Sequence, residues 1–99
     1  MPRESSIVRA ILRYLNGLDD CVARKLHGDS FSVTGDPDIY GCYRGRCFQL
    51  EVKQEGGRLS PAQKYRLDEW REAGAFCSAV RSIADAKALI EAINEAIER

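Results

Sequence analysis

Apolar side chains recur near both ends of the chain at the three- and four-residue spacing of a helix that buries one side. The first such stripe predicts a helix over residues 3–16, ended by Asn16-Gly17; it contains Ile7, Val8, Ile11, Leu12 and Leu15. The last stripe predicts a helix capped by Ser82; it contains Ala86, Leu89, Ile90, Ile93 and Ile97. A third helix is expected from Ser60-Pro61 to Gly74, because Ser is a good N-cap and Pro suits the first helical position.

Shorter apolar or alternating segments lie between these helices and predict strands at about 20–27, 39–43, 46–54 and 76–80, with a loop over 28–35. Arg44-Gly45 joins the second and third strands as a two-residue hairpin turn. The predicted order is α-β-β-β-α-β-α within one domain, residues 1–99. This order indicates an α/β fold with a central mixed sheet flanked by helices.

The hairpin turn fixes which residues face each other, because pairs across it have numbers that sum to 89. Asp38 therefore opposes Glu51, and Lys53 lies two residues further along on the same face. The other face carries Phe48, Leu50 and Val52, which point into the predicted core. Alternation thus gathers two carboxylates and one ammonium group on one surface.

Two carboxylates directly opposed in a sheet repel each other, so Asp38 and Glu51 require a compensating charge. Lys53 supplies part of it, and a divalent cation bound by hard oxygen ligands, Mg²⁺ or Mn²⁺, supplies more. The alternative is a polar sheet face that is simply exposed to solvent.

Two further polar residues have ambiguous positions. Glu4 lies on the core-facing stripe of the first helix, but an acid in a first turn also favours the helix dipole. Gln63 is the third helical residue after Ser60, so Ser-x-x-Gln makes a capping box that needs no other role.

Composition and charge narrow the class of protein. The chain has 99 residues and zero formal charge, which excludes nucleic-acid binding by overall field alone. Residues 1–66 carry 11 Lys and Arg against 8 Asp and Glu, whereas residues 67–99 carry 4 against 7. No transmembrane span or secretory signal is visible. A single His27 and four cysteines without C-x-x-C spacing predict reduced thiols in the cytoplasm rather than a zinc or redox site.

Three short motifs resemble the virus-type replication-repair nuclease (VRR-NUC) domain of the PD-(D/E)XK nuclease superfamily. They are Gly35-Asp36-Pro37-Asp38, Glu51-Val52-Lys53 and Leu59-Ser60-Pro61-Ala62-Gln63. The resemblance covers nearly the whole chain, from Glu4 to the closing helix, and implies a restriction-endonuclease-like core. Asp36 adds a carboxylate where the family is variable and often apolar, and the sequence leaves open whether it joins the acidic site.

The resemblance implies a role for each matching residue. Asp38, Glu51 and the Val52 carbonyl resemble ligands of Mg²⁺ or Mn²⁺, and Glu4 resembles an acid that contacts the metal directly or through water. Lys53 resembles the lysine that orients or activates the attacking water. Gln63 matches the glutamine of the helix that follows the core strands. The implied reaction is metal-assisted hydrolysis of a DNA phosphodiester.

The remaining expectations concern DNA and partners. Candidate phosphate contacts flanking the site are Lys25, Arg44, Arg46, Arg58 and Lys64, with Arg24 and Arg66 as further cations. No base-reading module is present, which favours branched or junction DNA, as for a Holliday-junction resolvase in DNA repair. A homodimer is expected, with the final helix and the aromatic residues Tyr65 and Trp70 as candidate surfaces, although Trp70 also suits the core. The expected location is the cytoplasm of a bacterial or phage-infected cell.

Two alternatives remain open from the sequence. One is a catalytically silent nuclease-fold module that binds DNA or a protein. The other is a small structural α/β protein whose polar sheet face is only solvated.

Overall fold

The computed structural model describes residues 2–26 and 33–99, and in these two ranges seven elements follow one another in the predicted order. The elements are α1 (Glu4–Asn16), β1 (Cys21–Lys25), β2 (Ile39–Tyr43), β3 (Arg46–Val52), α2 (Pro61–Glu72), β4 (Phe76–Val80) and α3 (Ile83–Glu98). The predicted order α-β-β-β-α-β-α is confirmed. His27 and most of the predicted loop over 28–35 lie outside the described residues.

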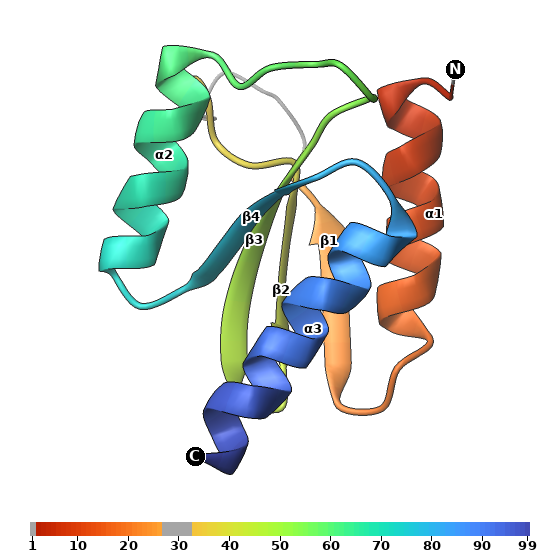
Figure 1. Cartoon of the computed structure of the whole chain (residues 1–99), viewed down its shortest axis with the longest axis vertical. Helices are drawn as coiled ribbons and strands as arrows, with labels where there is room; N and C mark the ends of the chain where they lie inside the picture. Colours follow the sequence, from red (N-terminus) through yellow and green to blue (C-terminus); the bar gives the residue numbers. More distant parts are fainter. Residues whose placement is uncertain (1, 27–32) are drawn as a thin grey trace.

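The strands form one mixed sheet in the order β1-β2-β3-β4. β1 pairs with β2 and β2 with β3 in antiparallel fashion, whereas β4 lies parallel to β3 at the sheet edge. Figure 1 shows α1 and α3 on one side of the sheet and α2 on the other. The mixed sheet flanked by helices is therefore confirmed.

The main core lies between the sheet and the pair α1 and α3. Phe48, Leu50 and Val52 are completely buried there, as the alternation of β3 predicts. They pack with the apolar stripes of the two helices: Ile7, Val8, Ile11 and Leu15 from α1, and Ala86, Leu89, Ile90 and Ile93 from α3. Removing these side chains from water is the main source of stability for the fold.

The hairpin between β2 and β3 has the predicted register. Tyr43 pairs with Arg46, and Tyr40 pairs with Gln49. Both turn residues have left-handed backbone angles, with φ of 50° at Arg44 and 81° at Gly45, as a tight two-residue turn requires. β3 ends at Val52 rather than at the predicted residue 54, because a turn closed by the Gly57 N–H and the Gln54 carbonyl directs the chain toward α2.

The second sheet face is covered at β3, which strand alternation alone does not reveal. α2 packs over β3 and β4, and Gln49 and Glu51 retain only 7% and 2% of their exposure. The alternative of a polar face that is simply exposed to solvent is therefore wrong at these two residues. α2 begins as predicted with a complete Ser60–Gln63 capping box, and the chain turns after it at Gly74, with φ of 110°.

Candidate active site

Asp38 and Glu51 lie side by side at the end of the β2–β3 hairpin farthest from its turn. Asp38 directly precedes β2, and its backbone carbonyl accepts a hydrogen bond from the Leu26 N–H at 2.7 Å. Its Oδ2 accepts a second bond from the Val52 N–H at 2.8 Å. The carboxyl groups of Asp38 and Glu51 are also hydrogen-bonded to each other. The two acids therefore share one face, as the register predicts.

The surroundings of Glu51 oppose its negative charge. Burial raises the pKa of Glu51 to about 8, and the hydrogen bond and the charge of Asp38 act in the same direction. The positive charge of Lys53 lowers that pKa, and Glu4 raises it slightly. One ammonium group thus fails to balance the pair, so near neutral pH the pair retains a proton in the absence of another cation.

The paired carboxylates fit a hard divalent cation. Two oxygen-bearing side chains with excess negative charge are ligands that Mg²⁺ and Mn²⁺ prefer. Within residues 2–26 and 33–99, however, no three His, Cys, Asp or Glu side chains form a group suited to a metal ion. Glu4 lies exposed in the first turn of α1 and influences Glu51 only through its charge. The structure therefore brings together two of the three predicted acids.

Gln63 joins the start of α2 to the acidic pair. Its Oε1 accepts a hydrogen bond from the Ser60 N–H at 2.9 Å, which completes the capping box. Its Nε2 then donates to Glu51 Oε2 at 3.4 Å. The two interpretations of Gln63 are thus compatible, because the cap uses the amide oxygen and leaves the amide nitrogen for Glu51.

Glycines bring the surrounding loops close to the site. Gly35 has φ of 86°, and a Cβ there would lie 2.7 Å from the Ala62 carbonyl carbon. The loop that carries Asp38 can therefore pass the first turn of α2 only without a side chain at this position. Gly57 lies against the side chain of Lys53, which is partly buried.

Asp36 is directed toward α2. Its Oδ1 accepts a hydrogen bond from Trp70 Nε1 at 3.4 Å, and both side chains line a cavity of about 170 Å³ with Leu26, Tyr40 and Gln49. The sequence left open whether Asp36 joins the acidic site. In the structure its hydrogen-bond partner is an indole on α2 rather than one of the two paired acids.

The predicted DNA-binding cations divide between the two ends of the hairpin. Lys25 pairs with Ile39, next to Asp38; Arg58 lies on the β3–α2 loop; and Lys64 lies in the first turn of α2. All three are exposed. Arg66 is engaged elsewhere, with the Thr34 carbonyl and with Glu69.

Arg44 and Arg46 do not flank the acidic pair, contrary to the prediction. They lie at the hairpin turn, and Arg44 donates to the Asn94 side chain of α3 at 2.8 Å. The acids lie at the other end of the strands, about 20 Å away for six residues at about 3.3 Å each. The prediction relied on closeness in sequence, but each residue of an extended strand adds about 3.3 Å of separation.

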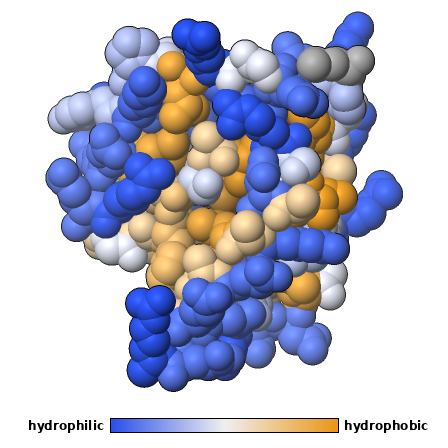
Figure 2. Space-filling model, in the orientation of Figure 1, coloured by the Kyte–Doolittle hydropathy of each residue, from blue (hydrophilic) through white to orange (hydrophobic). Residues whose placement is uncertain are grey.

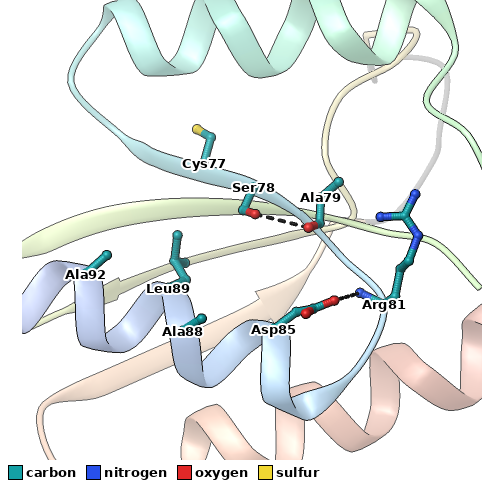
Figure 3. A pocket seen from close by; sticks show the side chains of 8 residues that line it. All are labelled: Cys77, Ser78, Ala79, Arg81, Asp85, Ala88, Leu89 and Ala92. Carbon is teal, nitrogen blue, oxygen red and sulfur yellow. Dashed lines mark hydrogen bonds between the residues drawn. The ribbon is translucent and has the colours of Figure 1, made fainter. Parts of the chain in front are cut away.

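Arg81 lies near this site, although the sequence did not single it out. It follows β4 directly, and its Nη2 donates to the Gly57 carbonyl at 2.6 Å. Figure 3 shows its backbone N–H bonded to Asp85, at 2.8 Å, while its side chain extends away from α3. The sequence did contain a signal for Arg81, because it follows a strand that is parallel to β3. The carboxyl ends of parallel strands lie at the same end of a sheet.

Comparisons with solved structures identify the fold. A structure described as a VRR_NUC domain is 28% identical, with 89% of this chain and 94% of that chain covered and a TM-score of 0.72. A VRR_NUC domain protein is 15% identical, with 91% and 86% covered and a TM-score of 0.70. The chain has the fold of a VRR_NUC domain. The resemblance of the chain to VRR-NUC is thus confirmed at the level of the fold.

A third similar structure broadens this relationship. It is Hjc, a Holliday junction resolvase from the archaeal hyperthermophile Archaeoglobus fulgidus, 22% identical, with 79% of this chain and 67% of that chain covered and a TM-score of 0.62. The VRR_NUC fold of this chain is therefore a restriction-endonuclease-like PD-(D/E)XK nuclease fold. No family model matches the sequence, and no curated protein matches it. No helix in the described ranges is long and apolar enough to span a bilayer.

Proposed function

We propose that this protein is a Mg²⁺- or Mn²⁺-dependent, structure-selective DNA endonuclease that hydrolyses phosphodiester bonds. The observation that carries the proposal is the buried carboxyl of Glu51 held against the half-buried Asp38, with the charge of Lys53 acting on it, in a nuclease fold. A merely solvated sheet face does not account for a carboxylate that is 2% exposed and held against a second acid. Such an arrangement costs stability unless a bound cation compensates it.

Asp38, Glu51 and the Val52 carbonyl would hold the cation, and Glu4 would act on it through water. When bound, the cation supplies charge stabilisation at the scissile phosphate and lowers the pKa of a coordinated water. The chain fixes the ligands in advance: the Val52 N–H holds Asp38, and the Gln63 amide holds Glu51. This orientation by neighbouring groups is typical of functional carboxylates.

Lys53 would position the attacking water and stabilise the negative charge that develops on the phosphate. It follows β3 directly, its backbone N–H is bound by the Val80 carbonyl at 3.0 Å, and its side chain packs against Gly57. The backbone that carries this side chain is therefore joined to the end of β4. Its charge already acts on Glu51, which supports closeness to the reacting centre.

The DNA backbone would be held by the cations at this end of the sheet. Four exposed cations belong to the segments at this end of the sheet: Lys25, Arg58, Lys64 and Arg81. Several such contacts are needed, because each neutralised phosphate adds only a modest, salt-dependent increment to affinity. Arg44 and Arg46 are not part of this surface.

Branched or junction DNA is the substrate class that we propose, with a homodimer carrying two sites for paired cuts. The similarity to a Holliday junction resolvase supports this class.

The proposed dimer surface lies beside β4, the last strand of the sheet. Figure 2 shows apolar surface between α2 and α3 next to this strand. A groove of about 420 Å³ there is lined by residues of β4 and of α3, the predicted dimer helix, and by Arg81 between them. Tyr65 is 61% exposed and provides further apolar area. The proposed setting remains DNA repair in the cytoplasm of a bacterial or phage-infected cell.

Cleavage assays test the function. Purified protein is incubated with labelled linear, flap and four-way-junction DNA in Mg²⁺, Mn²⁺ or EDTA. We expect metal-dependent cutting, strongest on branched DNA, that falls at least about 100-fold in Asp38→Asn and in Lys53→Ala. Binding of these DNAs without cutting in either metal would instead support the silent nuclease-fold module. Unchanged cutting by either variant would contradict the assigned roles.

A further inference from the structure

Cys42 and Cys47 lie directly opposite each other on β2 and β3, and both are exposed. They form the next pair beyond Tyr43 and Arg46, which flank the two-residue turn. The residues that flank such a turn make a hydrogen-bonded pair, and pair types alternate along an antiparallel ladder. Cys42 and Cys47 therefore occupy a non-hydrogen-bonded position, where opposed Cα atoms are about 4.5 Å apart.

This position suits a disulfide bond without movement of the backbone. Bridged cysteines have Cα separations from about 4.4 to 6.8 Å, and opposed residues project their side chains from the same face. The register is held by Arg44 and Gly45, which both adopt the left-handed backbone that the turn needs. A slip of one residue would move the apolar side chains of β3 out of the core, so the two thiols stay opposed.

The other two cysteines, Cys21 and Cys77, are poorly placed to form a disulfide with Cys42 or Cys47. Cys21 is buried on the opposite face, paired with Tyr43, and burial raises the pKa of its thiol. Cys77 is half-buried and aligned with Gln49 rather than with Cys47. Its side chain lies on the α2 side of β4 (Figure 3), and burial raises the pKa of its thiol too. A raised thiol pKa leaves less of the reactive thiolate.

We propose that Cys42 and Cys47 are a modification site, a thiol pair that closes reversibly into an intramolecular disulfide on contact with a disulfide oxidant such as oxidised glutathione. One cysteine thiolate attacks a sulfur of oxidised glutathione, which forms a mixed disulfide and releases one reduced glutathione. The second cysteine then attacks the protein-bound sulfur and displaces the second reduced glutathione. The two cysteines give up two electrons and two protons, and oxidised glutathione accepts them.

The bond would join β2 to β3 at the turn end of the hairpin. Cys42 is four residues from Asp38, or about 13 Å along an extended strand, so the acidic pair is not rearranged by the closure. The two thiols would form this bond whether or not the protein is a nuclease. The two thiols stay reduced at the glutathione redox potential of a cytoplasm, because exposed disulfides have higher reduction potentials than buried structural ones. They become oxidised when that potential rises.

Peptide mapping of the folded protein tests the proposal. The protein is equilibrated with oxidised glutathione, unreacted thiols are blocked under denaturing conditions, and the chain is digested with trypsin. Cleavage after Arg44 and Arg46 separates the two cysteines into peptides 26–44 and 47–53. We expect these peptides as one linked species that lacks two hydrogens and separates on reduction, with Cys21 and Cys77 recovered as blocked thiols.

Matched variants define the outcome. Cys42→Ser and Cys47→Ser should each lose the linked species and instead carry one glutathione on the remaining exposed thiol. A double variant, Cys21→Ser with Cys77→Ser, should retain the link unchanged. Separate glutathione adducts on both residues of the wild type, a link to Cys77, or disulfide-linked dimers as the main product would overturn the proposal.

Discussion

Gln63 donates a hydrogen bond to the carboxylate of Glu51 while its own amide oxygen caps the helix on which it lies. The start of α2 and the buried acid of β3 are therefore fixed by one side chain. A motif that is sufficient for helix capping thus also orients a group that we propose as a metal ligand. The two functions of Gln63 can be separated experimentally, because Ser60 takes part in the cap alone.

Removing the Gln63 side chain should affect both stability and cleavage. Gln63→Ala loses half of the capping box and the amide that orients Glu51, so we expect lower thermal stability and slower metal-dependent cutting, by about 10- to 100-fold. Ser60→Ala is the control: it should lower stability by about 0.5–2 kcal/mol and leave the cutting rate of the folded protein nearly unchanged. Equal cutting rates in the two variants would contradict a role for the Gln63–Glu51 contact.

The stability of the metal-free protein should fall as the pH rises. The pKa of Glu51 is about 8 in the fold against 4.5 ordinarily, so folding favours the protonated form. This contribution is fully present below about pH 4.5 and is lost progressively up to about pH 8. Thermal unfolding in EDTA across this range measures it. Glu51→Gln should show a shallower decline, and Mg²⁺ should reduce the decline in the wild type; parallel curves for wild type and variant would refute the assignment.

Much of this architecture follows from local rules. The two-residue turn fixed the register that brings Asp38 against Glu51, and the spacing of Ile7, Ile11 and Leu15 predicted which side of α1 is buried. These features depend on neighbours in sequence or on the period of one element. They could be predicted because no distant part of the chain changes them.

Features that depend on tertiary packing were missed. The burial of Glu51 requires α2 to cross the second sheet face, and α2 has only Leu67 fully buried to indicate such packing. The contact of Asp36 with Trp70 and that of Arg81 with Gly57 join distant segments in the same way. No residue pattern within one element specifies these contacts.

Gly35 should tolerate no side chain. Gly35→Ala adds a methyl group against the Ala62 backbone and also forces a non-glycine residue to φ of 86°. Gly56→Ala is a matched control, since φ is 81° and nothing lies within 4 Å of the added atom. We expect Gly56→Ala to cost about 1–2 kcal/mol and Gly35→Ala clearly more, measured by urea unfolding. Equal losses would contradict the close approach of this loop to α2.

Cations at the two ends of the hairpin should differ in their effect on DNA binding. Arg58→Ala and Lys64→Ala should each weaken junction binding and reduce the salt dependence of log K by about 0.9 per lost phosphate contact. Arg44→Ala and Arg46→Ala, at the turn, should leave both quantities nearly unchanged. Binding measured across a salt series distinguishes the two pairs of variants. A larger loss of DNA affinity in the turn variants would contradict the DNA surface that we propose.

Calorimetric titration of Mn²⁺ into the wild type and into Asp38→Asn tests most directly whether the two acids form a cation site. We predict saturable binding to the wild type that is lost or weakened at least about 10-fold in the variant, with its unfolding in EDTA confirming that it remains folded. Binding of equal affinity to both proteins, or no binding to the folded wild type, would contradict the account.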